Sequence, residues 1–209
     1  MAGKITQLKV QQRHRERVSV YLDGRFALGV PELVAARLKV GQFLSDVDIE
    51  SLREKGDVEQ AYDSALDYLS YRPRSRWELA GYLRRHGADE EQIETVLERL
   101  EQAGLSGDEA FARYWVENRE RFRPRGPAAL RQELRAKGVD REVIDGVLEG
   151  LDSADGAYRA AARKAGQLRG LDRVSFVRKL VEFLARRGFE FDVAKEVAER
   201  HLRELTEEA

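Results

Sequence analysis

The sequence predicts a mainly α-helical protein, in which three tandem three-helix repeats form an elongated, curved body after a small antiparallel β-sheet with short helices. The repeats are indicated by Leu79, Leu83 and Gly87, which recur as Leu130, Leu134 and Gly138 and again as Leu180, Leu184 and Gly188. A fixed period of about 50 residues is typical of stacked helical modules, because each module buries its apolar face on a neighbour. The first 30 residues instead alternate apolar and polar side chains, the pattern of half-buried strands.

The amino-terminal region, residues 1–57, is expected to contain the sheet. Two segments, Ile5–Val10 and Val18–Leu22, have a period of two. Asp23-Gly24 is a favoured pair for a two-residue hairpin turn, and Phe26–Val30 is the predicted returning strand. These segments together predict an antiparallel hairpin with one further strand.

Short helices are predicted between this sheet and the repeats. Pro31 suits the first turn of a helix over Glu32–Leu38. A second helix is expected to run from a capping box at Ser45, completed by Asp48, to Lys55. Gly56-Asp57 is the predicted boundary between this region and the first repeat.

From residue 58 the sequence predicts repeats at 58–107, 108–153 and 154–209. In the first repeat, Pro73 ends one helix, the capping box Ser75–Glu78 begins the next, Gly87 ends it and Asp89 caps the third. Three apolar residues of that third helix, Ile93, Val96 and Leu100, have helical spacing. The other repeats follow the same order, which predicts nine helices in three triplets. In the first repeat the predicted helices cover 58–71 and 75–87, and a third begins at the Asp89 cap. Those of the other repeats cover 108–122, 127–137 and 140–151, and then 154–168, 175–187 and 191–205.

Composition excludes several classes of function. The 209 residues carry 37 Lys and Arg against 38 Asp and Glu, so the net charge of −1 implies no bulk attraction to nucleic acid. The chain has no cysteine, which excludes disulfides, cysteine-ligated zinc and a thiol nucleophile. His14, His86 and His201 lie in no catalytic motif, and no glycine-rich phosphate loop is present. We therefore expect no enzyme, cofactor or metal site, and the absence of a long apolar run predicts a soluble, cytoplasmic protein.

Charge is segregated within the first two repeats, and this suggests a binding surface. Basic residues dominate before Gly87 and Gly138, and acidic residues dominate the helices after them. Two turns, Arg72-Pro73-Arg74 and Arg123-Pro124-Arg125, present arginines from a backbone that proline stiffens, and guanidinium groups suit phosphates and carboxylates. A second basic cluster precedes each repeat glycine. The candidate binding residues are Arg72, Arg74, Arg76, Arg84, Arg85, Arg121, Arg123, Arg125, Arg131, Arg135, Lys137, Arg186 and Arg187.

The same features also have simpler structural explanations. Basic residues near a helix carboxyl end offset its partial negative charge, and acidic helices commonly face solvent. Aromatic residues at helical spacing are expected to pack in the core rather than to stack on bases. These aromatics are Tyr68, Tyr71, Trp77, Tyr82, Phe111, Tyr114, Trp115 and Phe122.

Three segments give the chain a resemblance to the RecX family of regulatory proteins. Residues 65–75, with Glu78-Leu79, resemble the first repeat of that family, and residues 123–139 are close to its most distinctive stretch. Residues 183–189 resemble the third-repeat signature, although Arg173-Val174-Ser175 replaces the Arg-Pro-Arg turn there. The segment 21–30 is similar to the hairpin region of longer members.

The resemblance implies a non-enzymatic modulator of the RecA recombinase, with roles in DNA repair, recombination and the SOS response. Such a protein lies along the groove of the RecA–DNA filament and restrains its ATPase, strand-exchange and coprotease activities. The implied partners are the RecA filament and, weakly or through the filament, single- or double-stranded DNA; no membrane is expected, and three self-packed repeats favour a monomer. Two alternatives stay open: an autonomous basic nucleic-acid-binding module, and a metal-dependent nuclease.

Overall fold

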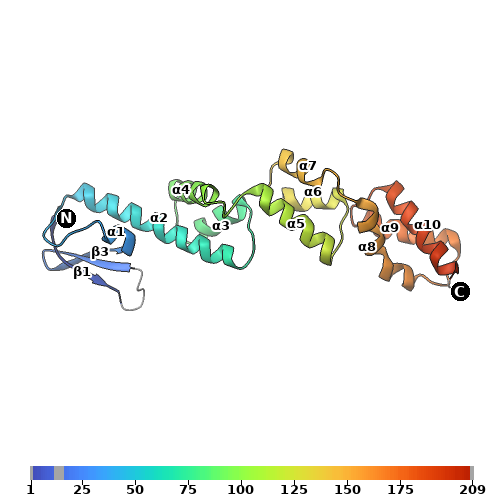
Figure 1. Cartoon of the computed structure of the whole chain (residues 1–209), viewed down its shortest axis with the longest axis horizontal. Coiled ribbons are helices and arrows are strands. Elements are labelled where there is room, and N and C mark those ends of the chain that lie inside the picture. Colours follow the sequence, from blue (N-terminus) through green and yellow to red (C-terminus); the bar gives the residue numbers. More distant parts are fainter. Residues whose placement is uncertain (1, 12–16, 208–209) are drawn as a thin grey trace. The chain divides into compact units, whose positions relative to one another are not determined.

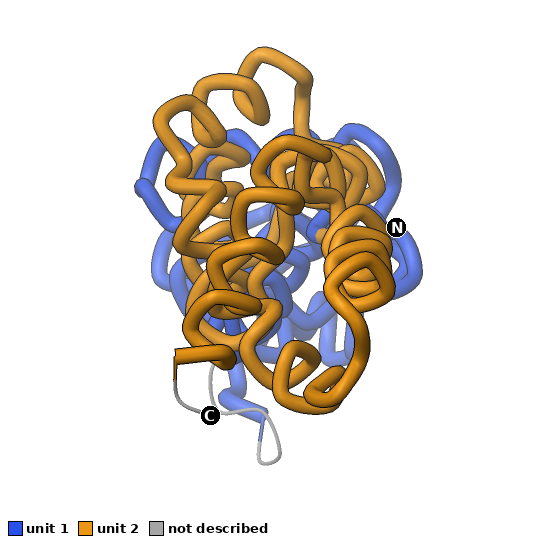
Figure 2. The backbone as a smooth tube through the Cα atoms, turned by 90° about the vertical axis from the view of Figure 1, so that its right-hand side faces the viewer, with its two compact units in different colours: residues 1–72, 79–105 blue, residues 73–78, 106–209 orange. Residues whose placement is uncertain are grey.

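The computed structural model describes residues 2–11 and 17–207, which form an amino-terminal sheet followed by helices (Figure 1). Across these residues there are four strands and ten helices. The chain divides into two compact units, Met1–Arg72 with Leu79–Leu105, and Pro73–Glu78 with Ser106–Ala209 (Figure 2). None of the helices described is both long and apolar enough to span a bilayer. His14 lies outside the described residues.

The sheet of the first unit has the strand order β3-β2-β1-β4, with antiparallel pairing throughout. The predicted strands are confirmed as β1 (Gly3–Val10), β2 (Arg17–Leu22) and β3 (Arg25–Pro31). Asp23 and Gly24 join β2 to β3 with φ of 47° and 80°, the left-handed values of a tight hairpin turn. β4 (Phe43–Leu44) was not predicted, because two residues are too few to show a period.

The predicted break at Gly56 is wrong. After the short α1 (Glu32–Ala35), a single helix, α2, runs without interruption from Asp46 to Ser70. Its capping box at Ser45 and Asp48 is confirmed. Gly56 lies inside α2, where an added Cβ would be 3.6 Å from Cδ of Pro31, so the glycine marks the place where the helix passes close to β3. The division of the chain into domains at residue 57 stays a prediction.

The second half of α2 packs with α3 (Arg76–Arg85) and α4 (Glu90–Gln102) around a small apolar core. Leu79, Leu83 and Val96, three of the residues that recur through the sequence, are fully buried there. Gly87 ends α3 with φ of 92°, and Asp89 caps α4 through the amide of Gln92, both as predicted. The first triplet is therefore a self-contained three-helix module.

The second unit contains the other two triplets. The second consists of α5 (Asp108–Phe122), α6 (Pro127–Arg135) and α7 (Arg141–Leu148). The third consists of α8 (Ser153–Gln167), α9 (Arg173–Ala185) and α10 (Phe191–Glu207). Each has its own core, to which the recurring leucines contribute: Leu130 and Leu134 in one, Leu180 and Leu184 in the other. The predicted helices are confirmed, except that α9 begins earlier, at Arg173 rather than Ser175.

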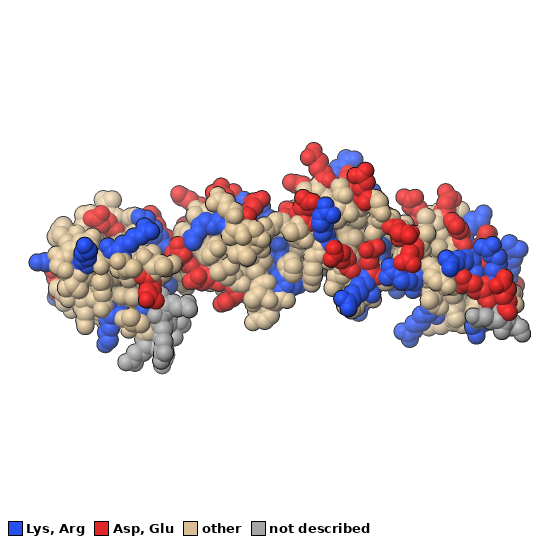
Figure 3. Space-filling model, in the orientation of Figure 1, with Lys and Arg blue, Asp and Glu red and all other residues tan. Residues whose placement is uncertain are grey.

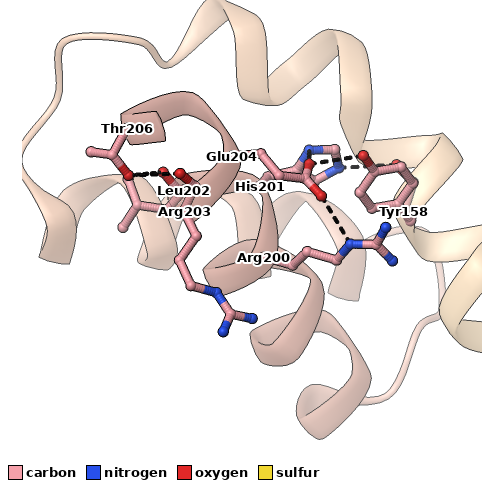
Figure 4. A network of polar contacts seen from close by, with 7 residues as sticks. All are labelled: Tyr158, Arg200, His201, Leu202, Arg203, Glu204 and Thr206. Carbon is pink, nitrogen blue, oxygen red and sulfur yellow. Dashed lines mark hydrogen bonds and ion pairs between the residues drawn. The ribbon is translucent and has the colours of Figure 1, made fainter. Parts of the chain in front are cut away.

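A polar network ties α8 to α10 in the third triplet (Figure 4). His201, only 6% exposed, stacks on the ring of Tyr158 and places Nε2 3.1 Å from the Tyr158 carbonyl oxygen. The Tyr158 hydroxyl donates to Glu204 at 2.8 Å, and Arg200 Nε donates to the same carboxylate at 2.9 Å. These two hydrogen bonds hold the pKa of Glu204 below its ordinary value. His201 thus has a structural role.

Three of the aromatics expected in the core are instead exposed: Tyr71 by 84%, Trp77 by 62% and Phe122 by 66%. All three lie at or next to a helix end, where helical spacing no longer determines which side meets a neighbour. Phe111 is buried as predicted, and Tyr68 stacks on Tyr82 with ring centroids 4.2 Å apart. The core prediction was therefore correct for helix interiors and wrong for helix ends.

Candidate binding surface at the joint between repeats

The Arg-Pro-Arg turn of the second repeat contacts the carboxyl end of α9. The amide of Gly126 donates to the carbonyl of Arg187 at 2.9 Å, and the amide of Ala128 donates to that of Gly188 at 3.3 Å. A Cβ on Gly126 would lie 2.1 Å from the Gly188 oxygen, so no side chain fits. The amides at the start of α6, which have no partner within that helix, thus donate to carbonyls at the carboxyl end of α9. We call this contact the repeat joint.

The segment Pro73–Glu78 forms an equivalent joint with the carboxyl end of α6. The Ser75 hydroxyl donates to the carbonyl of Lys137 at 2.7 Å, and Lys137 Nζ donates to the Glu78 carboxylate at 2.6 Å. A Cβ on Gly138 would lie 2.5 Å from Cβ of Trp77, so this contact is nearly as tight as the one between Gly126 and Gly188. The segments that follow the two Arg-Pro-Arg turns therefore both take part in repeat packing.

The third repeat lacks this turn for a structural reason. Its second helix begins a turn earlier, at Arg173, and Asp172 caps it by accepting from the amide of Ser175 at 3.0 Å. The extra turn occupies the place that the extended Arg-Pro-Arg segment takes in the other repeats.

Three of the predicted cations converge at the joint of the second and third repeats. Arg123 and Arg125 come from the turn, and Arg187 comes from the end of α9, with its guanidinium 4.6 Å from the centre of the Phe183 ring. Burial and repulsion from Arg125 and Arg123 lower the pKa of Arg187, which shows that like charges face one another. We call these three residues the arginine cluster. An anion bound there would relieve this repulsion.

Glu133 anchors this surface, although its role was not predicted. Its carboxylate accepts from Trp115 Nε1 at 2.8 Å and from Arg119 Nε at 2.7 Å, and it lies 3.8 Å from Nε of Arg125. It therefore links α5, α6 and the turn. One sequence signal could have indicated this role, because Glu133 is an acidic residue within a basic segment.

Several other predicted cations are engaged in ion pairs. Arg84 pairs with Glu90 at 2.7 Å, and Arg131 pairs with Asp145 at 3.3 Å. These pairs, like that of Lys137 with Glu78, favour a structural role for the three cations. Figure 3 shows acidic and basic side chains interleaved on the visible face of the second unit.

The remaining candidates fall into two sets. Arg72 lies in the first unit, whereas Arg74 and Arg76 belong to the second, where the amide of Arg76 donates to Asp108 at 3.0 Å. The other set is exposed and forms no ion pair within the described residues. It consists of Arg85, Arg121, Arg135 and Arg186, and Arg123 of the arginine cluster is likewise exposed and without an ion pair there.

The histidines and possible metal-holding groups were also located. The described residues contain no cluster of three or more His, Asp or Glu side chains placed to hold a metal ion. His86 directs Nδ1 to the carbonyl of Tyr82 at 2.8 Å, and His201 is part of the network in the third repeat. The arginine cluster is the candidate site at this surface.

These features define a helical-repeat protein whose modules meet at arginine-bearing joints. RecX family models match four segments in chain order: the N-terminal domain at 3–45, and the first, second and third three-helix domains at 61–100, 108–148 and 152–198. The chain belongs to the RecX family of regulatory proteins, which confirms the resemblance found in the sequence.

Individual relatives agree with this assignment. The regulatory protein RecX of Bacillus subtilis is 32% identical over 195 residues, which cover 90% of this chain and 74% of the relative. That of Streptomyces coelicolor is 40% identical over 166 residues, covering 76% and 88%. A crystal structure of a regulatory protein RecX matches 95% of this chain and 100% of its own with a TM-score of 0.78 and 28% identity.

Proposed function

We propose that this chain regulates the RecA recombinase by binding the RecA–DNA filament and restraining its ATPase, strand-exchange and coprotease activities. Family membership supports a regulatory role. The observation that carries the binding site is the convergence of Arg123, Arg125 and Arg187 at the repeat joint, where the amide of Gly126 donates to the Arg187 carbonyl at 2.9 Å. Burial, and then repulsion from Arg125 and Arg123, lower the pKa of Arg187. Their ligand is an anionic group of the filament, either a DNA phosphate or a recombinase carboxylate.

The repeat joint suits this task because it holds the arginines in place before binding. Proline stiffens the turn, two backbone hydrogen bonds fix it to α9, and Glu133 restrains Arg125 from the other side. Less side-chain entropy is therefore lost when the ligand binds. Arg121, Arg135 and Arg186, which are exposed on the same two repeats, are proposed to extend the surface.

ATP hydrolysis by RecA filaments on single-stranded DNA tests the proposal. The unaltered chain should lower the hydrolysis rate, and combining Arg123→Glu with Arg187→Glu should raise the half-effective concentration by about tenfold or more, as for loss of a binding hot spot. Arg163→Glu, a single charge reversal at an exposed position of α8, is the matched control for Arg123→Glu and Arg187→Glu made one at a time. Absence of any effect of the unaltered chain at stoichiometric amounts would refute the proposed function. An equal loss in the control would instead refute the role of the arginine cluster.

One observation supports autonomous binding of nucleic acid as a second candidate. Phe122 is 66% exposed, and the guanidinium of Arg121 lies 5.2 Å from the centre of its ring, so an aromatic and a basic group are displayed together. Fluorescence anisotropy with a labelled single-stranded oligonucleotide, without RecA and over a range of salt, tests it. Tight, salt-steep binding that Phe122→Ala weakens would favour this candidate over filament binding. The net charge of −1 favours weak binding.

A further inference from the structure

The outer face of the third repeat has an apolar furrow that the repeat joint does not use. Between α9 and α10 lies a hollow of about 510 Å³, lined by Val174, Val177, Val181 and Phe191 among others. Val174 is 75% exposed and Phe191 is 64% exposed. A second hollow of about 490 Å³ shares Arg173 and Glu199 with the first and extends the furrow to Leu202 and Arg203. Exposed apolar surface of this kind commonly marks an interaction site.

The second repeat has an ion-paired face where the third repeat has the furrow. In the second repeat, Arg131 and Arg141 both pair with Asp145 and so cover the equivalent face with ion pairs. The repeat period of about 50 residues places Val181, Phe191 and Lys195 at the corresponding positions of the third repeat. Val181 and Phe191 thus lie where the second repeat has ion-paired arginines. The repeat architecture by itself does not require this change.

The rim of the furrow carries an excess of positive charge. Its cations are Arg173, Arg178, Lys195 and Arg203, and its acids are Glu182 and Glu199. None of these side chains forms an ion pair with another described residue. A partner with apolar side chains flanked by carboxylates would complement both the apolar floor and the positively charged rim of the furrow.

We propose that this furrow is a docking site for an acidic amphipathic helix of a partner protein. Val174, Val177 and Val181 form a helical stripe on α9, and the furrow follows α10 from Phe191 to Arg203, a length of about 18 Å at 1.5 Å per residue. A helix of about three turns fits this length, in the helix-in-groove mode of recognition. Nucleic acid fits less well, because the floor is apolar and two carboxylates repel phosphates. The site is separate from the arginine cluster and does not depend on the proposed function.

A synthetic peptide can test the site in the full-length chain. The probe is a fluorescein-labelled helix of about 16 residues, with leucines at i, i+4, i+7 and i+11 and glutamates at most other positions. Its controls are a scrambled peptide of the same composition and a peptide with lysine in place of glutamate. Anisotropy at low salt should show binding of the acidic amphipathic peptide and binding at least about tenfold weaker for both controls. Equal binding of either control, or no binding of the probe, would overturn the proposal.

Substitutions in the furrow then test whether the peptide binds there. Val181→Asp and Lys195→Glu should each weaken the peptide by about tenfold. Val47→Asp is the matched control, since Val47 is 78% exposed in the first unit, and circular dichroism verifies the fold of each variant. The chain with Arg123→Glu and Arg187→Glu should bind the peptide normally, which separates this site from the proposed function. Unchanged binding by Val181→Asp would overturn the proposal.

Other occupants of the furrow would give different results. Concentration-dependent self-association in sedimentation velocity, abolished by Val181→Asp, would assign the furrow to a second copy of the chain. Displacement of the peptide by an oligonucleotide, lost with Lys195→Glu, would assign it to nucleic acid. Either result would overturn the proposal.

Discussion

Gly126→Ala is the substitution that tests the repeat joint most directly. The added methyl group would lie 2.1 Å from the oxygen of Gly188, 2.2 Å from its carbonyl carbon and 2.3 Å from the nitrogen of Phe189. All three atoms are backbone, so the clash cannot be relieved by a side-chain rotation. The φ of Gly126 is −75°, which alanine adopts without strain, so the effect would arise from the contact alone.

The expected cost follows from what the joint would lose. Overpacking a tight contact costs about 1–3 kcal/mol. Separating the backbones also weakens the hydrogen bonds from Gly126 to Arg187 and from Ala128 to Gly188, each worth about 1 kcal/mol. The lower conformational entropy of alanine in the unfolded chain offsets part of this loss. We expect the free energy of unfolding to fall by about 2–4 kcal/mol.

Urea denaturation followed by circular dichroism measures the change. Gly146→Ala is the control, since Gly146 lies within α7 and an added Cβ would meet nothing within 4 Å, so it should stabilise by up to about 1 kcal/mol. Hydrogen exchange at the amides of Gly126 and Ala128 should accelerate in the Gly126 variant. In an array of repeats, loss of an interface also reduces cooperativity, so the transition should broaden. Equal midpoints for the two variants would refute the role of the joint.

Three further predictions concern the helices and the buried polar groups. Gly56→Ala should raise the free energy of unfolding by up to about 1 kcal/mol, because alanine favours the interior of α2 and the new Cβ makes only ordinary van der Waals contacts with β3; a fall in the urea midpoint would contradict this. Glu133→Gln should lower the free energy of unfolding by about 1–2 kcal/mol and alter the fluorescence of Trp115, since a charged acceptor of two hydrogen bonds is lost. Unchanged stability and emission would argue against the role of Glu133 as an anchor. Because its folded-state pKa is lowered from 4.5, Glu204 stabilises the chain above pH 4.5, and this contribution is lost as the pH falls through the lowered pKa. Tyr158→Phe should move the pKa of Glu204 back towards 4.5 in an NMR titration, and a value that does not move would show that the Tyr158 hydrogen bond is not its cause.

Periodic and capping signals predicted most of the secondary structure. Alternation identified the first three strands, Asp23-Gly24 identified their turn, and the recurring leucines and glycines identified three helical triplets. These signals are local, because a cap or a left-handed turn is determined by residues within a few positions of one another. The exception was Gly56, which resembles a linker locally but lies in a continuous helix that approaches a strand.

The candidate site was predicted only in part, since its residues come from different repeats. The charge pattern identified Arg123, Arg125 and Arg187 separately, but no sequence signal placed the third beside the other two. The charge pattern also did not distinguish these three arginines from Arg84 and Arg131, which lie at similar positions in the sequence but pair with carboxylates. Partner choice among long, flexible side chains depends on distances across helices, and these require the packed structure.

The sequence by itself determined the modules of this protein: their number, the order of their helices, the glycines that end them and the apolar positions that fill each core. Tertiary structure alone decided what the Arg-Pro-Arg turns do. Gly126 and Gly188 are far apart in the chain, and their contact exists only because two modules pack closely enough for their backbones to touch. The same packing determines which arginines repel one another and which are neutralised. Local sequence encodes a helix and its caps, whereas the contacts between modules depend on surfaces that form only after each module has folded.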